Sequence, residues 1–140
     1  MILKLYIKKY SVFFKYLPWL ERSEGITLLT KIYLRPDIYD NLSSAEPTSY
    51  NIAVMMHEET HIKSIRREGW LKFGILYLFS GAYRFNEELL ANKAAFKYLK
   101  KHGSNVDLER KACILSSWLY LWPVSYAVAL KQVEKAWNEA

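Results

Sequence analysis

The sequence has 140 residues, 51% of them hydrophobic and 16% aromatic, which is enough for one domain with a sizeable core. The net charge of +6 is spread along the chain without a basic stripe interleaved with aromatic residues, so no nucleic-acid partner is expected. The single cysteine, Cys113, excludes an internal disulfide and favours a reducing, cytoplasmic location.

The N-terminal segment, residues 2–20, is apolar but interrupted by four lysines, which is not the pattern of a secretory signal peptide. We expect an amphipathic helix that ends near Pro18. Such a helix either packs on the domain or lies on a membrane surface, and the second alternative would make the protein peripherally membrane-associated.

The next segment, residues 26–34, is rich in β-branched and aromatic residues and stops before Pro36. This composition predicts a strand, or a hairpin of two short strands. Asp, Asn, Ser and Pro dominate residues 37–49, where we expect a loop that leads into a helix at Pro47 or Thr48.

Helices are predicted for most of the remaining chain. The first should run to about Arg67, because Gly69 lies just beyond it. A second long helix fits residues 83–101, and a third helical region fits residues 107–137 with a break at Pro123.

Two apolar stretches raise the question of a membrane span. Residues 70–83 are too few to cross a bilayer, whereas residues 112–130 are uncharged over a length that reaches the threshold. Because Pro123 would kink or end a helix, we interpret the longer stretch as two buried segments. A transmembrane helix is the alternative.

The most informative motif is H-E-x-x-H at residues 57–61, within the first of the long helices. His57 and His61 are four residues apart, so both imidazoles can bind one metal ion, such as Zn²⁺. Glu58 projects beside the metal, where it can accept a proton from a metal-activated water molecule. The alternative is a pair of core histidines that bond to the backbone, although two histidines on an inward face require a partner.

A catalytic zinc site needs a third ligand from another element. His102 lies at the end of a helix, where a surface capping role is expected. Glu88 is the stronger candidate, because the helical periodicity of residues 84–99 places it at the edge of the apolar face and Asn92 within that face. The same periodicity predicts that Glu87 is exposed to solvent.

These motifs resemble the gluzincin metallopeptidases. H-E-x-x-H followed after 26 residues by Glu88-x-x-Ala91 is similar to the thermolysin type and to the CAAX prenyl protease type. The layout over residues 26–101 also looks like minimal zincin-like domains of bacteria and phages, in which a strand ending in I-Y-L-x-P precedes the H-E-x-T-H helix.

The resemblance implies a set of roles and a fold. His57, His61 and Glu88 would be the zinc ligands and Glu58 the general base of peptide-bond hydrolysis. The implied fold is α+β and mainly helical: a single domain with a small sheet whose edge strand binds the substrate backbone. The rival function is a catalytically weak or inactive zincin-like scaffold that binds a protein or membrane surface.

Other roles concern residues around the ligands. Asn92 stands where the family has an aspartate that orients a ligand histidine. Arg84 lies one turn before Glu88 and would pair with that carboxylate or stabilise an oxyanion. An oxyanion stabiliser is also expected. The sequence leaves four candidates open: Tyr83, Arg84, Tyr120 and Tyr126.

Overall fold

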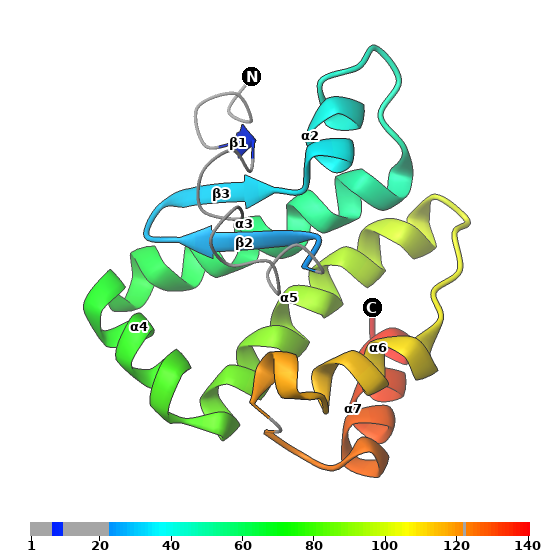
Figure 1. Cartoon of the computed structure of the whole chain (residues 1–140). Coiled ribbons are helices and arrows are strands. Elements are labelled where there is room, and N and C mark those ends of the chain that lie inside the picture. The colour runs from blue at the N-terminus through cyan, green and yellow to red at the C-terminus, as the bar shows by residue number, and fades with distance from the viewer. Residues whose placement is uncertain (1–6, 10–22, 122) are drawn as a thin grey trace.

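The computed structural model describes residues 7–9, 23–121 and 123–140. Its described strands form one three-stranded sheet in the order β1 (Ile7–Lys9), β3 (Lys31–Leu34), β2 (Gly25–Leu28) (Figure 1). The helix expected over residues 2–20 is wrong for Ile7–Lys9, because these residues form a strand that pairs in parallel with β3. This pairing provides hydrogen-bond partners for the backbone groups on the second edge of β3. The rest of that prediction lies outside the described residues.

The hairpin predicted within residues 26–34 is confirmed. β2 and β3 pair antiparallel, and Leu29 in the turn between them has a positive φ of 57°. Ile32 and Leu34 of β3 are fully buried against the helices, so the sheet covers one side of the helical layer.

The loop expected over residues 37–49 is wrong in its first half, where α2 (Pro36–Leu42) forms. Pro36 occupies the first turn of this helix, where its missing N–H costs nothing, and Ile38 is buried in the core below the sheet. Burial of one apolar side chain therefore outweighs the turn-forming composition of the segment.

The two long helices are confirmed. α3 (Ser49–Glu68) begins after Thr48, whose hydroxyl accepts a hydrogen bond from the Asn51 N–H, and ends at Gly69, whose φ of +88° suits glycine. α5 (Gly81–Lys101) begins after Ser80, and the two helices pack against each other. Together they form the framework that carries the site.

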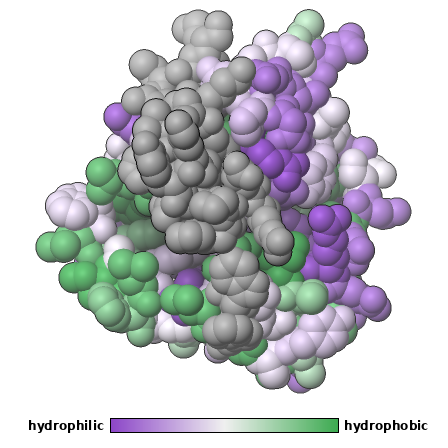
Figure 2. All heavy atoms as spheres, in the orientation of Figure 1, coloured by the Kyte–Doolittle hydropathy of each residue, from purple (hydrophilic) through white to green (hydrophobic). Residues whose placement is uncertain are grey.

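α4 (Trp70–Phe79) connects these two helices at one end of the molecule (Figure 1). On its inner side Phe73 is buried, whereas large apolar side chains on its outer side are exposed to solvent. Figure 2 shows this hydrophobic surface over α4. The exposed side chains are Trp70, Leu71, Ile75, Leu78 and Phe79.

The C-terminal region contains α6 (Leu108–Leu115), the 3₁₀ helix η3 (Trp118–Tyr120) and α7 (Tyr126–Asn138). The break predicted near Pro123 is confirmed, and residues 112–130 are divided among three elements. No helix within the described parts of the chain has the length and apolar character to cross a membrane. α6 and α7 instead bury their apolar faces with one side of α5.

Candidate metal centre

Helix periodicity brings the two histidines of α3 together. His57 and His61 are one turn apart, and their Nε2 atoms are 3.3 Å from each other. His61 is only 5% exposed and His57 is half-buried. Both rings are directed toward α5, as the inward face predicted for this helix requires.

Glu88 of α5 completes the group. Its Oε2 lies 3.2 Å from His57 Nε2, and its Oε1 lies 3.3 Å from His61 Nε2. Ala91 and Ala95, one and two turns further along α5, are buried, and Ala95 packs against Ala53 of α3. Small side chains at the contact allow the helices to approach closely, so the three donor atoms converge on a space that could hold a metal ion.

Buried polar atoms of this group lack hydrogen-bond partners among the described residues. Among the described residues, the buried Glu88 Oε2 and His61 Nδ1 have no hydrogen-bond partner, although Tyr77 donates a bond of 2.5 Å to the other oxygen of Glu88. A buried polar atom without a partner is costly, and a cation at the centre would interact with Glu88 Oε2.

Charges within the group stabilise each other against burial. Burial by itself lowers the pKa of His61, but the nearby carboxylates, Glu88 foremost, outweigh it and raise the pKa to about 9. Burial also opposes ionisation of Glu88, but the two histidines hold its pKa well below the usual range. Without metal, a positive His61 and a negative Glu88 therefore form a buried ion pair.

Glu87 corrects the sequence interpretation, which placed it in solvent. It is only 6% exposed, because α5 is covered by α3 and α4 on one side and by α7 on the other. Its Oε2 lies 4.0 Å from His61 Nδ1, and both atoms lack a hydrogen-bond partner among the described residues. A carboxylate in this position can orient the ring of a ligand histidine.

Glu58 is held by the edge strand β2. Thr27 Oγ1 donates a 2.7 Å hydrogen bond to Glu58 Oε2. Gly25 lies against the same carboxylate, since a Cβ atom there would be 2.8 Å from Glu58 Oε1. The sequence motif identified Glu58 but gave no sign of these two contacts, because the strand is about 30 residues away in the chain and its packing on α3 is tertiary.

Asn92 and Arg84 make contacts that differ from those implied by the resemblance. Asn92 Nδ2 donates a 2.8 Å hydrogen bond to the Glu88 carbonyl, and thus secures the turn of α5 that carries Glu88. The guanidinium of Arg84 donates to the carbonyls of Tyr120 at 2.8 Å and Tyr77 at 2.5 Å, and to that of Leu78. Arg84 therefore ties α4 and η3 to α5.

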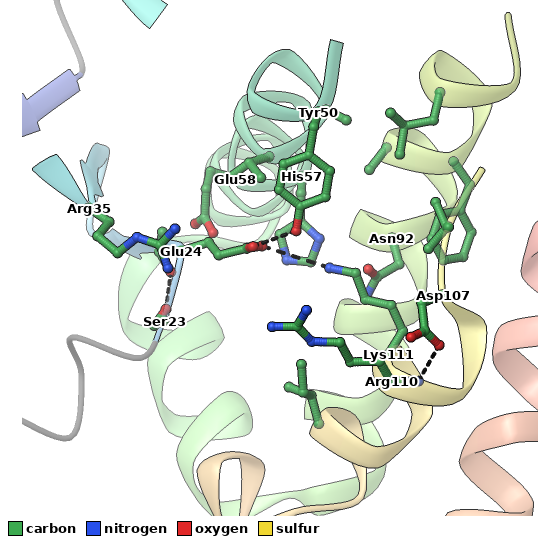
Figure 3. Close-up of a pocket in the computed structure, with 18 of the residues that line it drawn as sticks. Ser23, Glu24, Arg35, Tyr50, His57, Glu58, Asn92, Asp107, Arg110 and Lys111 are labelled. Carbon is green, nitrogen blue, oxygen red and sulfur yellow. Dashed lines mark hydrogen bonds and ion pairs between the residues drawn. The ribbon is translucent and has the colours of Figure 1, made fainter. Parts of the chain in front are cut away.

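A pocket of about 230 Å³ opens beside the group (Figure 3). His57, Glu58 and Asn92 line it, and so does Tyr120 of η3. The other expected oxyanion candidates are engaged or distant: Tyr83 bonds to Glu68, and Tyr126 is exposed at the start of α7. His102 is the exposed C-cap of α5, as predicted.

Comparisons of the chain with protein-family models, with curated proteins and with solved structures found no match. A functional proposal for this chain therefore depends on the residues of the site itself.

Proposed function

We propose that the chain is a zinc-dependent metallopeptidase of gluzincin type, with His57, His61 and Glu88 as the ligands. The spacing of the donor atoms carries the proposal. Ligand atoms about 2.0–2.1 Å from a tetrahedral zinc ion are roughly 3.3 Å apart. The two Nε2 atoms here are 3.3 Å apart, and each lies 3.2 or 3.3 Å from a different oxygen of the Glu88 carboxylate. With one ligand atom from each residue, all three atoms lie within 4.8 Å of one another. Two imidazoles and a carboxylate also leave a fourth position for water.

The chemistry assigns Glu58 the role of general base. A zinc ion at this site would supply a Lewis acid and lower the pKa of a water molecule to about 7. Glu58 opens on the same pocket as His57, so its carboxylate can accept the proton of the attacking water and deliver it to the leaving amine. The hydrogen bond from Thr27 fixes the orientation of the carboxylate for both transfers.

Tyr120 is the best of the oxyanion candidates. It lines the pocket, and burial together with the charge of Glu88 raises its pKa well above the ordinary value, so the phenol keeps its proton. A neutral phenol can donate a hydrogen bond to the oxyanion that develops on the attacked carbonyl.

The substrate backbone has a docking strand in β2. This strand pairs with β3 on one side and lies at the edge of the described sheet, and the pocket reaches it at Gly25. An extended peptide can add to such an edge through main-chain hydrogen bonds, with little dependence on sequence.

The first test is the metal content of purified protein by mass spectrometry, after dialysis against a mild chelator. We expect about one zinc ion per chain in the wild type and its loss in Glu88→Ala. Glu109→Ala on the exposed side of α6 is the matched control, and should keep the metal.

The second test is cleavage of a peptide library by the zinc-loaded protein. Glu58→Gln should retain zinc and lose activity by about 10²–10⁴-fold, the usual contribution of a general base. A wild type that retains no zinc, or equal cleavage by Glu58→Gln, would contradict the peptidase proposal.

A second candidate function is a catalytically inactive scaffold that binds an anionic membrane surface. The outer face of α4 favours it, because Trp70 is 60% exposed, Leu78 is 63% exposed and Phe79 is 84% exposed, and the chain carries a net charge of +6. Membrane binding by itself could also coexist with peptidase activity, because it would use the outer face of α4, whereas the inner face packs Phe73 against His61.

Sedimentation with vesicles of neutral or partly anionic lipid tests the second candidate. We expect binding to the anionic vesicles that weakens with salt and is lost in Leu78→Glu. Val128→Glu on α7, also at an exposed apolar position, is the control. If the wild type binds no vesicles and Glu58→Gln loses peptidase activity, the membrane-binding role is contradicted and the peptidase proposal stands.

A further inference from the structure

The pocket that begins at His57 and Glu58 is lined at its opposite side by basic residues of α6. Figure 3 shows Arg110 and Lys111 extending from this helix toward the pocket, across from Glu24. Neither residue belongs to the metal group or touches it, and the proposed hydrolysis does not use them. Their charges therefore need an explanation of their own.

The basic residues of the pocket differ in how well they are paired. Arg35 forms a two-bond pair with Asp37, at 2.6 and 2.8 Å. Among the described residues, the ion pair of Lys111 is a long contact of 3.9 Å with Glu24. The guanidinium of Arg110, which is exposed, has no ion pair with any residue that the structure describes.

The acidic residues of the pocket are engaged elsewhere. Asp107 caps α6 by accepting a 2.9 Å hydrogen bond from the backbone N–H of Arg110. Glu58 accepts from Thr27, and Glu24 accepts from the hydroxyl of Tyr50. The basic side chains on the α6 side of the pocket are therefore the groups available to bind a ligand, and they would bind an anion.

Part of the pocket wall is apolar. Phe96, Leu99, Val106, Ile114 and Leu119 line the pocket between α5, α6 and η3. A ligand that fits must therefore join an apolar portion to an anionic group. Arginine pairs with carboxylates through two parallel hydrogen bonds, and lysine adds a second positive charge.

We propose that Arg110 and Lys111 form a carboxylate-binding subsite, which selects peptides with an acidic side chain or a free C-terminus close to the bond that is cleaved. This inference rests on the proposed peptidase function, because the metal centre fixes where the scissile bond lies. The charged subsite gives the enzyme a selectivity that backbone pairing with β2 does not provide.

Glu24 acts as a competitor within the subsite. Its carboxylate lies between Tyr50 and Lys111, where it holds the position that a ligand carboxylate would take at Lys111 (Figure 3). Glu24→Gln should therefore strengthen the binding of acidic peptides. A gain in affinity is a result that damage to the fold cannot produce.

Fluorescence anisotropy measures the binding directly, with labelled Ala- and Gly-based octapeptides that carry Glu or Gln at each position in turn. Each peptide is prepared as a C-terminal acid and as an amide. Binding is measured on zinc-loaded Glu58→Gln protein, so that no peptide is cleaved, and again on metal-free wild type. A preference for Glu at one position identifies a side-chain carboxylate, whereas a preference for the acid over the amide identifies the C-terminus.

We expect the better carboxylate peptide to bind about tenfold more tightly than its neutral counterpart, or more, because charge-assisted hydrogen bonds are the stronger class. Arg110→Gln should reduce this ratio to near one, Arg110→Lys should restore part of it, and Glu24→Gln should increase it. Lys131→Gln on the exposed side of α7 should leave it unchanged. Thermal unfolding of each variant establishes that it is folded.

The outcomes separate the subsite from the peptidase activity. Equal binding of all peptides, or a carboxylate preference that survives in the Arg110→Gln/Lys111→Gln double variant, overturns the subsite whether or not the wild type cleaves peptides. If the carboxylate peptides bind more tightly as expected but the wild type cleaves no peptide, the proposed peptidase function is overturned. The pocket then remains a carboxylate-binding site.

Discussion

The two sides of α5 are packed in opposite ways. Toward α6 and α7, the helix buries Phe85 and Phe96 among apolar side chains of those two helices. Toward α3 and α4, it buries Glu87, Glu88 and Asn92, and α3 adds His61 and Glu58. A single helix thus has one apolar interface and one interface rich in ionisable groups.

The difference indicates what each side contributes. Apolar burial stabilises a fold by about 25 cal/mol per Å² of buried surface. The side of α5 that faces α6 and α7 therefore accounts for much of the stability that holds this helix in place. Buried ion pairs seldom repay their desolvation. The charged side is therefore better explained by function than by stability, and variants on the two sides should behave differently.

Phe96→Ala, on the apolar side, should give the largest loss of stability. Phe96 is only 1% exposed, and its removal should lower the free energy of unfolding by about 3–5 kcal/mol. Denaturant unfolding of the metal-free protein measures this change. Phe79→Ala on α4, where the ring is 84% exposed, should change it little. Folded Phe96→Ala protein should still bind one zinc ion, and a loss of zinc at full folding would contradict the separation of the two sides.

Replacing the buried pair by apolar residues should have the opposite effect. The double variant His61→Leu/Glu88→Leu should unfold with a free energy unchanged or raised by about 1–4 kcal/mol in the absence of metal, because two desolvated charges are removed. Glu88→Leu alone should be less stable than the double variant, since it leaves a buried imidazole without its carboxylate. If the double variant is strongly destabilised instead, the charged side contributes to stability after all.

The pH dependence of metal-free stability should report the same pair. The pKa of His61 is raised from 6.5 to about 9, so its stabilising effect is complete below pH 6.5 and is lost as pH rises toward 9. The pKa of Glu88 is lowered from 4.5, so its effect is present above pH 4.5 and is lost as pH falls further. Stability from this pair should peak between pH 4.5 and 6.5, and the double leucine variant should lack the peak.

The sequence predicted the parts of the molecule that local rules determine. The start and end of α3 follow from Thr48 and Gly69, and the two histidines share a face because they are four residues apart. Glu88 was inferred from the apolar periodicity of α5, and the structure places it within 3.3 Å of both histidines.

The errors concern residues whose environment depends on distant parts of the chain. Glu87 was assigned to solvent because the helical wheel assumes one buried face, whereas α5 is covered on both sides. The strand at Ile7–Lys9 depends on pairing with Lys31–Leu34, which no local pattern of that segment indicates. The contacts of Thr27 and Gly25 with Glu58 have the same origin.

Glu87→Gln tests whether the second buried carboxylate acts through His61. The substitution keeps the size of the side chain and removes the charge beside His61 Nδ1, so zinc affinity should fall by about 10- to 100-fold. Competition with a chromophoric chelator measures it. Glu134→Gln, at an exposed position of α7, is the matched control. Unchanged zinc affinity would mean that Glu87 serves only in packing, and that the proposed metal site consists of His57, His61, Glu88 and Glu58.

Gly25→Ala should give the smallest effect, and it acts only on Glu58, the proposed general base. The added Cβ would lie 2.8 Å from Glu58 Oε1, so the carboxylate must move away from its bond with Thr27. Since small misplacements of a catalytic group reduce turnover, we expect kcat to fall about tenfold while zinc content is unchanged. Gly74→Ala is the control, because an added Cβ there meets no atom within 4 Å and alanine favours the helix. Equal turnover by both alanine variants would mean that β2 does not position Glu58, and that the charged side of the molecule is organised by α3 and α5 without the sheet.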